Sequence, residues 1–257
     1  MGVTTVSDQV LRAARQHLHT VQLLAVDVAP GARMAQETSL EATHGAVAGA
    51  DEARVLAPVG GRAQDKAAAL ERLRERYAKE SRVAQSIRGW TNIVFGDGDP
   101  DAELMFIGEA PGADEDVQGI PFVGRAGQKL NEMIKAMGFA REGVYIANVL
   151  KVRPPNNRTP TPDEAASDGV FLEEQIRIVA PRAIVALGKP ASNYLLGSTD
   201  SMGSMRGRWH AWNGIPLMPT YHPAYLLRSY TPENRRRIWS DLQQVVQMLG
   251  SAPQNPE

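Results

Sequence analysis

Cysteine is absent from all 257 residues of the chain. Its absence excludes disulfide bonds, thiol catalysis and any metal ion or cluster that is held by thiolates. The sequence also lacks an apolar run long enough to span a bilayer, and its N-terminus has no apolar core of the secretory type. We therefore expect a cytoplasmic protein without a membrane partner.

The chain also lacks a large net charge, because it has 28 basic and 29 acidic residues and a formal net charge of −1. Any surface for a polyanion must therefore be a local patch. Residues 201–240 contain such a patch, with six arginines against one glutamate. Aromatic residues are interleaved with these arginines, namely Trp209, Trp212, Tyr221, Tyr225 and Tyr230. This composition suits a surface that follows a nucleic-acid backbone and stacks bases, although a solvated helix face explains residues 235–237 equally well.

The chain divides into three parts. Residues 1–65 are expected to form one N-terminal helix at 6–25 and a flexible linker rich in alanine, glycine and proline. Residues 66–250 are expected to form the main domain, which begins with a helix at 66–81. Residues 251–257 are expected to be a disordered tail.

Strand and helix patterns alternate along the main domain. Buried-strand patterns occupy 103–109, 144–150, 183–188 and 216–220. Helical patterns occupy 126–137, 162–179, 190–196 and 231–249. This alternation predicts an α/β fold of three layers, with a mostly parallel four-stranded sheet between two layers of helices.

Three of the predicted strands end in residues that can do chemistry. Glu109 follows the first strand, Asn148 lies near the end of the second, and His222 follows the fourth. Ligands of open α/β sheets bind beyond the carboxyl ends of the strands, so these side chains should share one crevice. Each has a plain alternative: Glu109 as a helix-capping acid, Asn148 as a turn residue, and His222 as a hydrogen-bonded loop histidine. The convergence of all three favours a functional site.

Five motifs together resemble the uracil-DNA glycosylase superfamily, and most closely its family 4, the iron–sulfur type. The motifs are GEAPGADED (108–116), GIPFVGRAG (119–127), YIANVLKVRPPNNRTPTPDE (145–164), IVALGKPA (184–191) and PTYHPAYLLR (219–228). The resemblance covers residues 93–249 and implies the fold of that superfamily.

The resemblance implies how a base would be recognised. Phe122 matches the aromatic residue that stacks on a flipped uracil. Asn148 matches the amide that pairs with the edge of uracil, and cytosine would present the opposite pattern of donors and acceptors. His222 matches the histidine that hydrogen-bonds uracil O2, where negative charge grows as the base departs.

The resemblance also implies a group that acts on water or on the sugar. Glu109 is the candidate, because Ala110 stands where other branches carry an aspartate. Gly112 stands where other branches place a tyrosine that excludes the thymine methyl group. Glu115 is the candidate for that steric wall here.

Contacts with DNA are expected from the loops that follow the strands. Leu226, Leu227 and Arg228 match the loop that fills the duplex once the base has been extruded. The remaining predicted DNA contacts are Arg153, Arg158, Arg206 and Tyr225.

One departure from family 4 is complete. Members of that family hold a four-iron cluster with four cysteines, and the matching positions here fall at or near Ser81, Ala84, Val152 and Asp168. Because all four thiolates are missing, we expect ordinary packing in place of the cluster, and neither a metal nor another cofactor.

The expected function is that of a monofunctional hydrolase, a uracil-DNA glycosylase that releases uracil from DNA as a monomer. An inactive or weakly active nucleic-acid-binding protein on the same fold and a glycosylase for another deaminated base are the alternatives. A general nucleotide-binding domain has little support, because no phosphate-cradling glycine motif is present.

Overall fold

Residues 63–250 are described in the computed structural model of the chain. The predicted helix at 6–25, nearly all of the predicted linker and the predicted tail at 251–257 lie outside these residues. The first described helix, α2 (Ala63–Glu80), begins three residues before the predicted start.

A six-stranded sheet lies at the centre of the domain, in the order β1-β3-β2-β4-β6-β5. Its four inner strands are parallel to one another and are the four predicted ones, β2 (Leu104–Gly108), β3 (Tyr145–Asn148), β4 (Ala183–Leu187) and β6 (Ile215–Thr220). The antiparallel edge strands β1 (Asp97–Gly98) and β5 (His210–Trp212) were not predicted. Both are too short, at two and three residues, to give a strand pattern in the sequence.

The inner strands are apolar throughout because both faces of the sheet are covered. In β2, Leu104 and Phe106 contribute to one core cluster, while Met105 and Ile107 contribute to the other. All four side chains are 0% exposed. Because successive side chains of a strand point to opposite faces of the sheet, β2 contributes to both core clusters.

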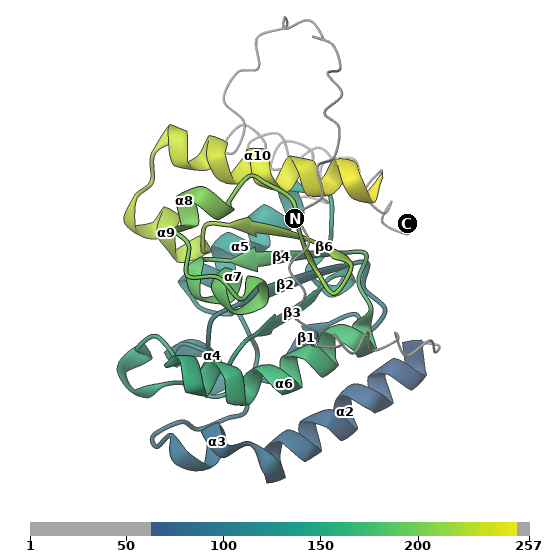
Figure 1. Ribbon diagram of the computed structural model, residues 1–257, viewed down its shortest axis with the longest axis vertical. Coiled ribbons are helices and arrows are strands. Elements are labelled where there is room, and N and C mark those ends of the chain that lie inside the picture. Colours follow the sequence, from purple (N-terminus) through teal and green to yellow (C-terminus); the bar gives the residue numbers. More distant parts are fainter. Residues whose placement is uncertain (1–62, 251–257) are drawn as a thin grey trace, which may run out of the picture.

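Helices complete the outer layers, as Figure 1 shows. One core cluster includes buried residues of α5 (Arg125–Ala136), α9 (Pro223–Arg228) and α10 (Pro232–Leu249). The other includes buried residues of α2, α6 (Pro162–Val179) and α7 (Lys189–Leu196), and α2 runs alongside α6. The short helices are α3 (Arg82–Ser86), α4 (Ala113–Gln118), α8 (Met202–Met205), η1 (Arg141–Gly143) and η2 (Pro155–Asn157).

Helix α6 has the predicted bounds because its start is encoded locally. The Thr161 hydroxyl accepts a hydrogen bond from the Glu164 amide at 3.2 Å, and the Glu164 carboxylate accepts one from the Thr161 amide at 2.8 Å. Pro162 occupies the first helical position, where a missing N–H costs nothing.

The carboxyl ends of the four parallel strands meet at one edge of the sheet. Gly108 of β2 lies opposite Asn148 of β3, and Leu187 of β4 lies opposite Thr220 of β6. The chain runs from β2 to β3 on one side and returns to β4 on the other, so β2 and β4 flank the point where the strand order reverses. Crevices in sheets of this kind open at that point.

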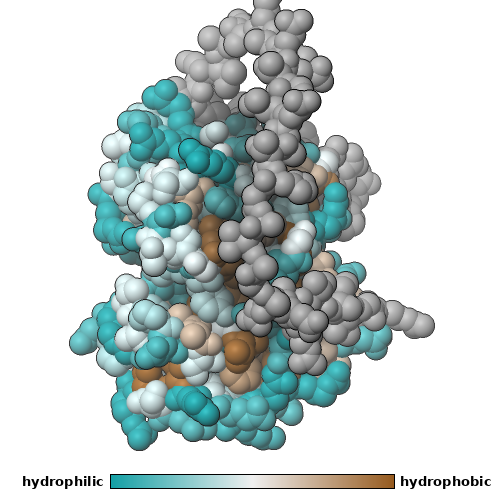
Figure 2. Space-filling model, viewed as in Figure 1, coloured by the Kyte–Doolittle hydropathy of each residue, from teal (hydrophilic) through white to brown (hydrophobic). Residues whose placement is uncertain are grey.

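One face of the molecule is largely polar. Hydrophilic residues cover most of the face seen in Figure 2, and hydrophobic ones show only in small patches. No helix in residues 63–250 combines the length and apolar character needed to cross a membrane.

Truncation of Phe106 tests the packing of the central strand. Phe106→Ala should lower the free energy of unfolding by about 3–5 kcal/mol, because it opens a cavity beneath α5 and α10 that neighbours cannot fill. Urea denaturation followed by circular dichroism measures the change. Val117→Ala is the control, since Val117 is 72% exposed and its truncation should change stability by less than about 0.5 kcal/mol.

Candidate active site at the carboxyl edge of the sheet

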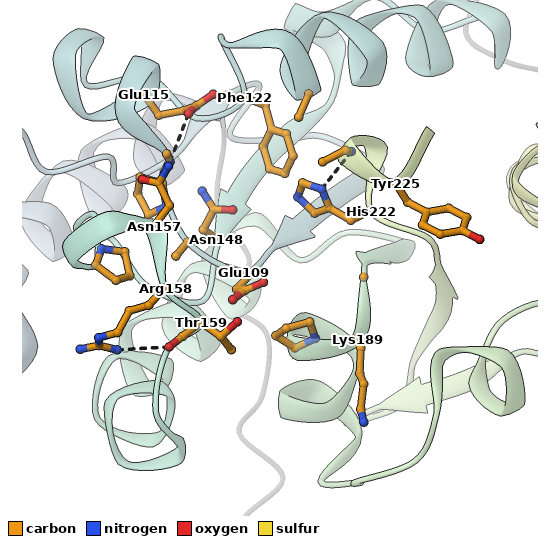
Figure 3. A pocket seen from close by; sticks show the side chains of 18 of the residues that line it. Glu109, Glu115, Phe122, Asn148, Asn157, Arg158, Thr159, Lys189, His222 and Tyr225 are labelled. Atoms are coloured by element: carbon orange, nitrogen blue, oxygen red, sulfur yellow. Dashed lines mark hydrogen bonds between the residues drawn. The ribbon is translucent and has the colours of Figure 1, made fainter. Parts of the chain in front are cut away.

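A cavity of about 750 Å³ opens at this edge. Loops from the ends of all four parallel strands line it, and Figure 3 shows their side chains converging. Every predicted catalytic and substrate-binding residue is among the lining residues, namely Glu109, Ala110, Gly112, Glu115, Phe122, Asn148 and His222. The topology thus brings together side chains that lie more than 100 residues apart in the sequence.

Asn148 presents its carboxamide to the cavity from the last position of β3. The residue is 1% exposed, and its Oδ1 atom has no hydrogen-bond partner within residues 63–250. Gly108 makes room for this side chain, because a Cβ there would lie 2.4 Å from Asn148 Oδ1 and 2.6 Å from Phe122 Cζ. The absence of a side chain at 108 therefore lets the amide and the aromatic ring meet.

Phe122 lies in the left-handed region, with a φ of 53°, and is 5% exposed. Such a backbone is costly for a residue with a side chain, so neighbours must hold it. The Glu115 carboxylate accepts hydrogen bonds from the amides of Val123 and Gly124, both at 2.9 Å. The Arg141 guanidinium donates to the Phe122 carbonyl at 3.2 Å.

Arg141 was not predicted as a site residue. It also donates to the Pro121 carbonyl at 2.6 Å and pairs with Asp97 at 3.2 Å, so it fixes the turn from outside the cavity. No motif contains it, because it lies between α5 and β3 and reaches the turn only through the fold.

The Glu115 carboxylate makes two sets of hydrogen bonds near the start of α4. Besides holding the Phe122 turn, its carboxylate accepts a hydrogen bond from the Gly112 amide at 3.1 Å. Ala110 and Gly112 present little side chain to the cavity. Among Ala110, Gly112 and Glu115, the large side chain that lines the cavity is therefore that of Glu115.

His222 caps α9, and its ring lies 5.5 Å from the ring of Phe122 between centroids. Its Nδ1 atom accepts a hydrogen bond from the Ala224 amide at 3.1 Å, which leaves the proton on Nε2. Burial, aided by the positive charge of Arg228, lowers the pKa of His222 to about 4. The imidazole is therefore neutral at physiological pH and can donate from Nε2.

Glu109 follows β2 directly and lies half-buried in the cavity. Burial raises the pKa of its carboxyl group, and a hydrogen bond from the Thr159 side chain opposes that rise. Thr159 was not predicted, although it lies in the quoted motif at 145–164 and lines the cavity. The Glu109 carboxyl group at the end of β2 is thus hydrogen-bonded to a polar loop residue.

Several predicted DNA contacts lie at the rim. Arg158, Tyr225 and Arg228 line the cavity, and Leu227 on α9 is 38% exposed. Arg158 makes two hydrogen bonds to Glu164, at 2.7 and 2.6 Å, and Arg153 donates to Asn157 at 2.6 Å.

Two residues that were predicted to contact DNA, Leu226 and Arg206, instead make contacts within the protein. Leu226 is 1% exposed and packs in the core under α9 and α10, so it is not available to DNA, and Leu227 is the leucine that points outward. Arg206 forms an ion pair with the buried Asp241, which also accepts a hydrogen bond from the Thr220 hydroxyl at 2.6 Å. The hydrogen bond from Thr220 therefore ties the end of β6 to α10, and Arg206 joins the segment after α8 to the same carboxylate.

Ligands for a metal are not evident in the described part of the chain. No group of three or more histidine, aspartate or glutamate side chains there could hold an ion. The positions that match the cluster cysteines carry Ser81, Ala84, Val152 and Asp168, of which none offers a thiolate. These side chains do not fit an iron–sulfur cluster.

Comparison with known proteins gives consistent matches. The family model "Uracil DNA glycosylase superfamily" matches residues 95–243. A Type-4 uracil-DNA glycosylase of Thermotoga maritima is 48% identical over 161 residues, which are 62% of this chain and 84% of that protein. Proteins of the same name from Saccharolobus solfataricus and Archaeoglobus fulgidus are each 41% identical, over 68% and 62% of this chain and 86% and 83% of their own lengths.

The low pKa of His222 predicts a dependence of stability on pH. The folded pKa of about 4 lies below the value of roughly 6.5 for an exposed histidine, so the unfolded chain binds more protons between these values. The free energy of unfolding should therefore hold a contribution of up to roughly 3 kcal/mol above pH 6.5 that is lost as pH falls towards 4. Urea denaturation of the wild type and of His222→Gln across this range measures it; equal pH slopes for the two proteins would contradict the assignment.

Proposed function

The chain belongs to the uracil-DNA glycosylase superfamily, and from this we propose that it hydrolyses the N-glycosidic bond of a flipped-out deoxyuridine in DNA. Free uracil and an abasic site are the products, so the protein is a monofunctional hydrolase of base excision repair. The unpaired Oδ1 atom of Asn148 is the observation that carries the assignment of the site.

Uracil supplies the donor that this atom lacks. A buried acceptor without a partner costs about 1–3 kcal/mol, which a ligand with a matching donor offsets. Uracil offers N3–H to Asn148 Oδ1 and O4 to the amide nitrogen, while cytosine would place a lone pair and an amino group there. The ring of Phe122, packed over Gly108 beside this amide, provides the surface on which the base stacks.

His222 acts on the opposite edge of the base. As the bond from C1′ to N1 breaks, its electron pair passes to the base and negative charge accumulates on O2. A neutral imidazole that donates from Nε2 stabilises this charge, and the Ala224 amide on Nδ1 fixes the tautomer. The low pKa of His222 suits this role, because a charged imidazolium would be costly in the same surroundings.

Glu109 is proposed to act on water. Its carboxylate positions a water molecule for attack at C1′, accepts a proton from it and stabilises positive charge on the sugar. Glu115 is proposed as the wall that excludes a 5-methyl group, since it contributes bulk where Ala110 and Gly112 do not.

DNA is proposed to lie across the rim formed by Arg158, Tyr225 and Arg228. Leu227 is the side chain proposed to enter the duplex in place of the extruded base, because it is exposed on α9. Arg153 is retained as a proposed phosphate contact. Arg206 is proposed to have no direct contact with DNA and to support this surface through its ion pair with Asp241.

Further properties are proposed from the sequence. With no cysteine in the chain, catalysis is proposed to proceed without an iron–sulfur cluster or another cofactor. The protein is proposed to act in the cytoplasm as a monomer. Residues 66–250 are proposed to be sufficient as the catalytic domain, with residues 1–65 and 251–257 as extensions.

Release of uracil from a labelled single-stranded oligonucleotide, followed by alkaline cleavage, tests the function. The wild type should cleave at uracil, and His222→Ala should reduce the rate by about 10²–10³-fold, as removal of a donor to a developing charge does in other enzymes. Binding without cleavage, on single strands and on U·G and U·A duplexes, would instead favour a nucleic-acid-binding protein. Cleavage only at another deaminated base would favour a different glycosylase.

Glu109→Gln tests the water-activating group. The substitution keeps the shape but removes the base, so the single-turnover rate should fall by about 10²–10³-fold. The wild-type rate should also fall on the acid side through a pKa above the usual value of about 4.3, since burial raises the pKa of Glu109 and the ionised form is required. Full activity of Glu109→Gln would contradict the assignment of Glu109 as the water-activating group.

A further inference from the structure

The positions that match the missing cysteines are close together in the fold. The Ser81 hydroxyl donates to Asp168 Oδ1 at 2.8 Å and also accepts from the Ala84 amide at 3.0 Å. Val152 is 0% exposed and belongs to the same core cluster against which Ala84 packs. Hydrogen bonds therefore join Ser81, Ala84 and Asp168, and Val152 follows Lys151, whose amide donates to Asp168 at 3.3 Å.

Asp168 is the centre of that contact. Its carboxylate is 0% exposed and accepts hydrogen bonds from three separate parts of the chain. The donors are the Tyr77 hydroxyl of α2 at 2.7 Å, the Ser81 hydroxyl before α3, and the Lys151 amide after β3 at 3.3 Å. We call this set, Asp168 with Tyr77, Ser81 and the Lys151 amide, the Asp168 hub.

Lys151 connects the hub to the active site. Its side chain is 0% exposed, and its Nζ atom donates to the Asn148 carbonyl at 2.6 Å. The same Nζ atom also donates to the Gln175 side chain, whose amide nitrogen donates to the Phe95 carbonyl at 2.9 Å. The main-chain amide of Lys151 is thus bound by the hub, and its side chain is bound to the main-chain carbonyl of Asn148.

A fully buried lysine is a costly way to fill a core position. Apolar side chains of similar volume often pack as well or better in such places. Lys151 instead donates a hydrogen bond to the carbonyl of Asn148, whose side-chain Oδ1 atom has no partner among residues 63–250. Its other side-chain contacts are with Gln175 of α6 and with the ring of Phe95, whose centre lies 5.6 Å from Nζ.

We propose that the Asp168 hub takes the place of a metal cluster in tying α2, α3 and α6 to the segment after β3, and that Lys151 is thereby a positioning residue for Asn148. The inference rests on the proposed function, in which Asn148 reads the base. It concerns the placement of the amide and not the chemistry at C1′.

A double-mutant cycle between Lys151 and Asn148 tests the proposal. The wild type, Lys151→Met, Asn148→Ala and the double variant are compared by single-turnover cleavage of a uracil-containing oligonucleotide, with enzyme in saturating excess and below the melting temperature of each. Lys151→Met should slow cleavage by about tenfold or more in the wild-type background, because a displaced binding group loses its alignment. In the Asn148→Ala background the same substitution should change the rate by less than about twofold, since no amide is left to position.

The cycle separates positioning from a general structural effect. An equal loss in both backgrounds, or no loss in the wild-type background, would overturn the proposal. Lys135→Met is the matched control, because Lys135 is exposed on α5, and it should leave the rate unchanged.

Milder variants keep the test open if Lys151→Met does not fold. Tyr77→Phe removes one donor to the hub, and Asp168→Asn removes its charge; both should slow cleavage with the same dependence on Asn148. Asp163→Asn, an exposed carboxylate on the same helix, should not. Unaltered cleavage by both Tyr77→Phe and Asp168→Asn would contradict the proposal.

A spectroscopic measurement distinguishes failure of this inference from failure of the proposed function. If the wild type does not cleave uracil-containing DNA, the function is wrong, and the side-chain amide signals of Asn148 in ¹⁵N NMR spectra still report its position. They should shift in Lys151→Met and Tyr77→Phe but not in Lys135→Met. Unshifted signals in both Lys151→Met and Tyr77→Phe would show that neither Lys151 nor the hub positions the Asn148 amide.

Discussion

Parallel pairing of four strands determines where the reactive groups of this protein lie. The register that sets Gly108 beside Asn148 also points the chain after β2 and the chain before α9 at the same crevice. A shift of one residue in β3 would turn Asn148 to the opposite face of the sheet, because successive side chains alternate. The apolar residues on both faces of β3 oppose such a shift, because Tyr145 and Ala147 contribute to one core cluster and Ile146 to the other, and they would have to exchange cores. The packing of the sheet therefore protects the geometry of the site.

Burial then sets the charges in that crevice. It raises the pKa of Glu109 and lowers the pKa of His222, so both effects favour the neutral form of the group. Only the hydrogen bond from Thr159 favours the ionised form of Glu109. The site thus suits a neutral base in the ground state, and its fixed donors gain strength where charge develops during reaction.

Much of this arrangement could be predicted from the sequence, and the reasons differ between elements. Helix α6 was predicted to the residue because Thr161, Pro162 and Glu164 encode its start locally. The four inner strands were recognised by their apolar runs, whereas β1 and β5 form only by pairing at the edges of a sheet that already exists. The residues predicted to catalyse the reaction and to bind the base lie in motifs, and all of them line one cavity, while their roles stay predictions. Arg141 was missed because its contacts with the Phe122 turn depend on tertiary structure. Leu226 and Leu227 are indistinguishable in the sequence, and only the phase of α9 shows which one is buried.

The unpaired oxygen of Asn148 also bears on how stable the folded protein can be. A leucine or methionine at position 148 would remove this unsatisfied acceptor, and the replacement of an unpaired buried polar group by an apolar one stabilises a fold. Under the proposed function, the amide lowers the stability of the native state in exchange for selectivity, and the left-handed backbone of Phe122 lowers it further. With the proposed role of Asn148, thermal tolerance and discrimination between bases are opposed at this one position, and a gain in either at residue 148 comes at the expense of the other.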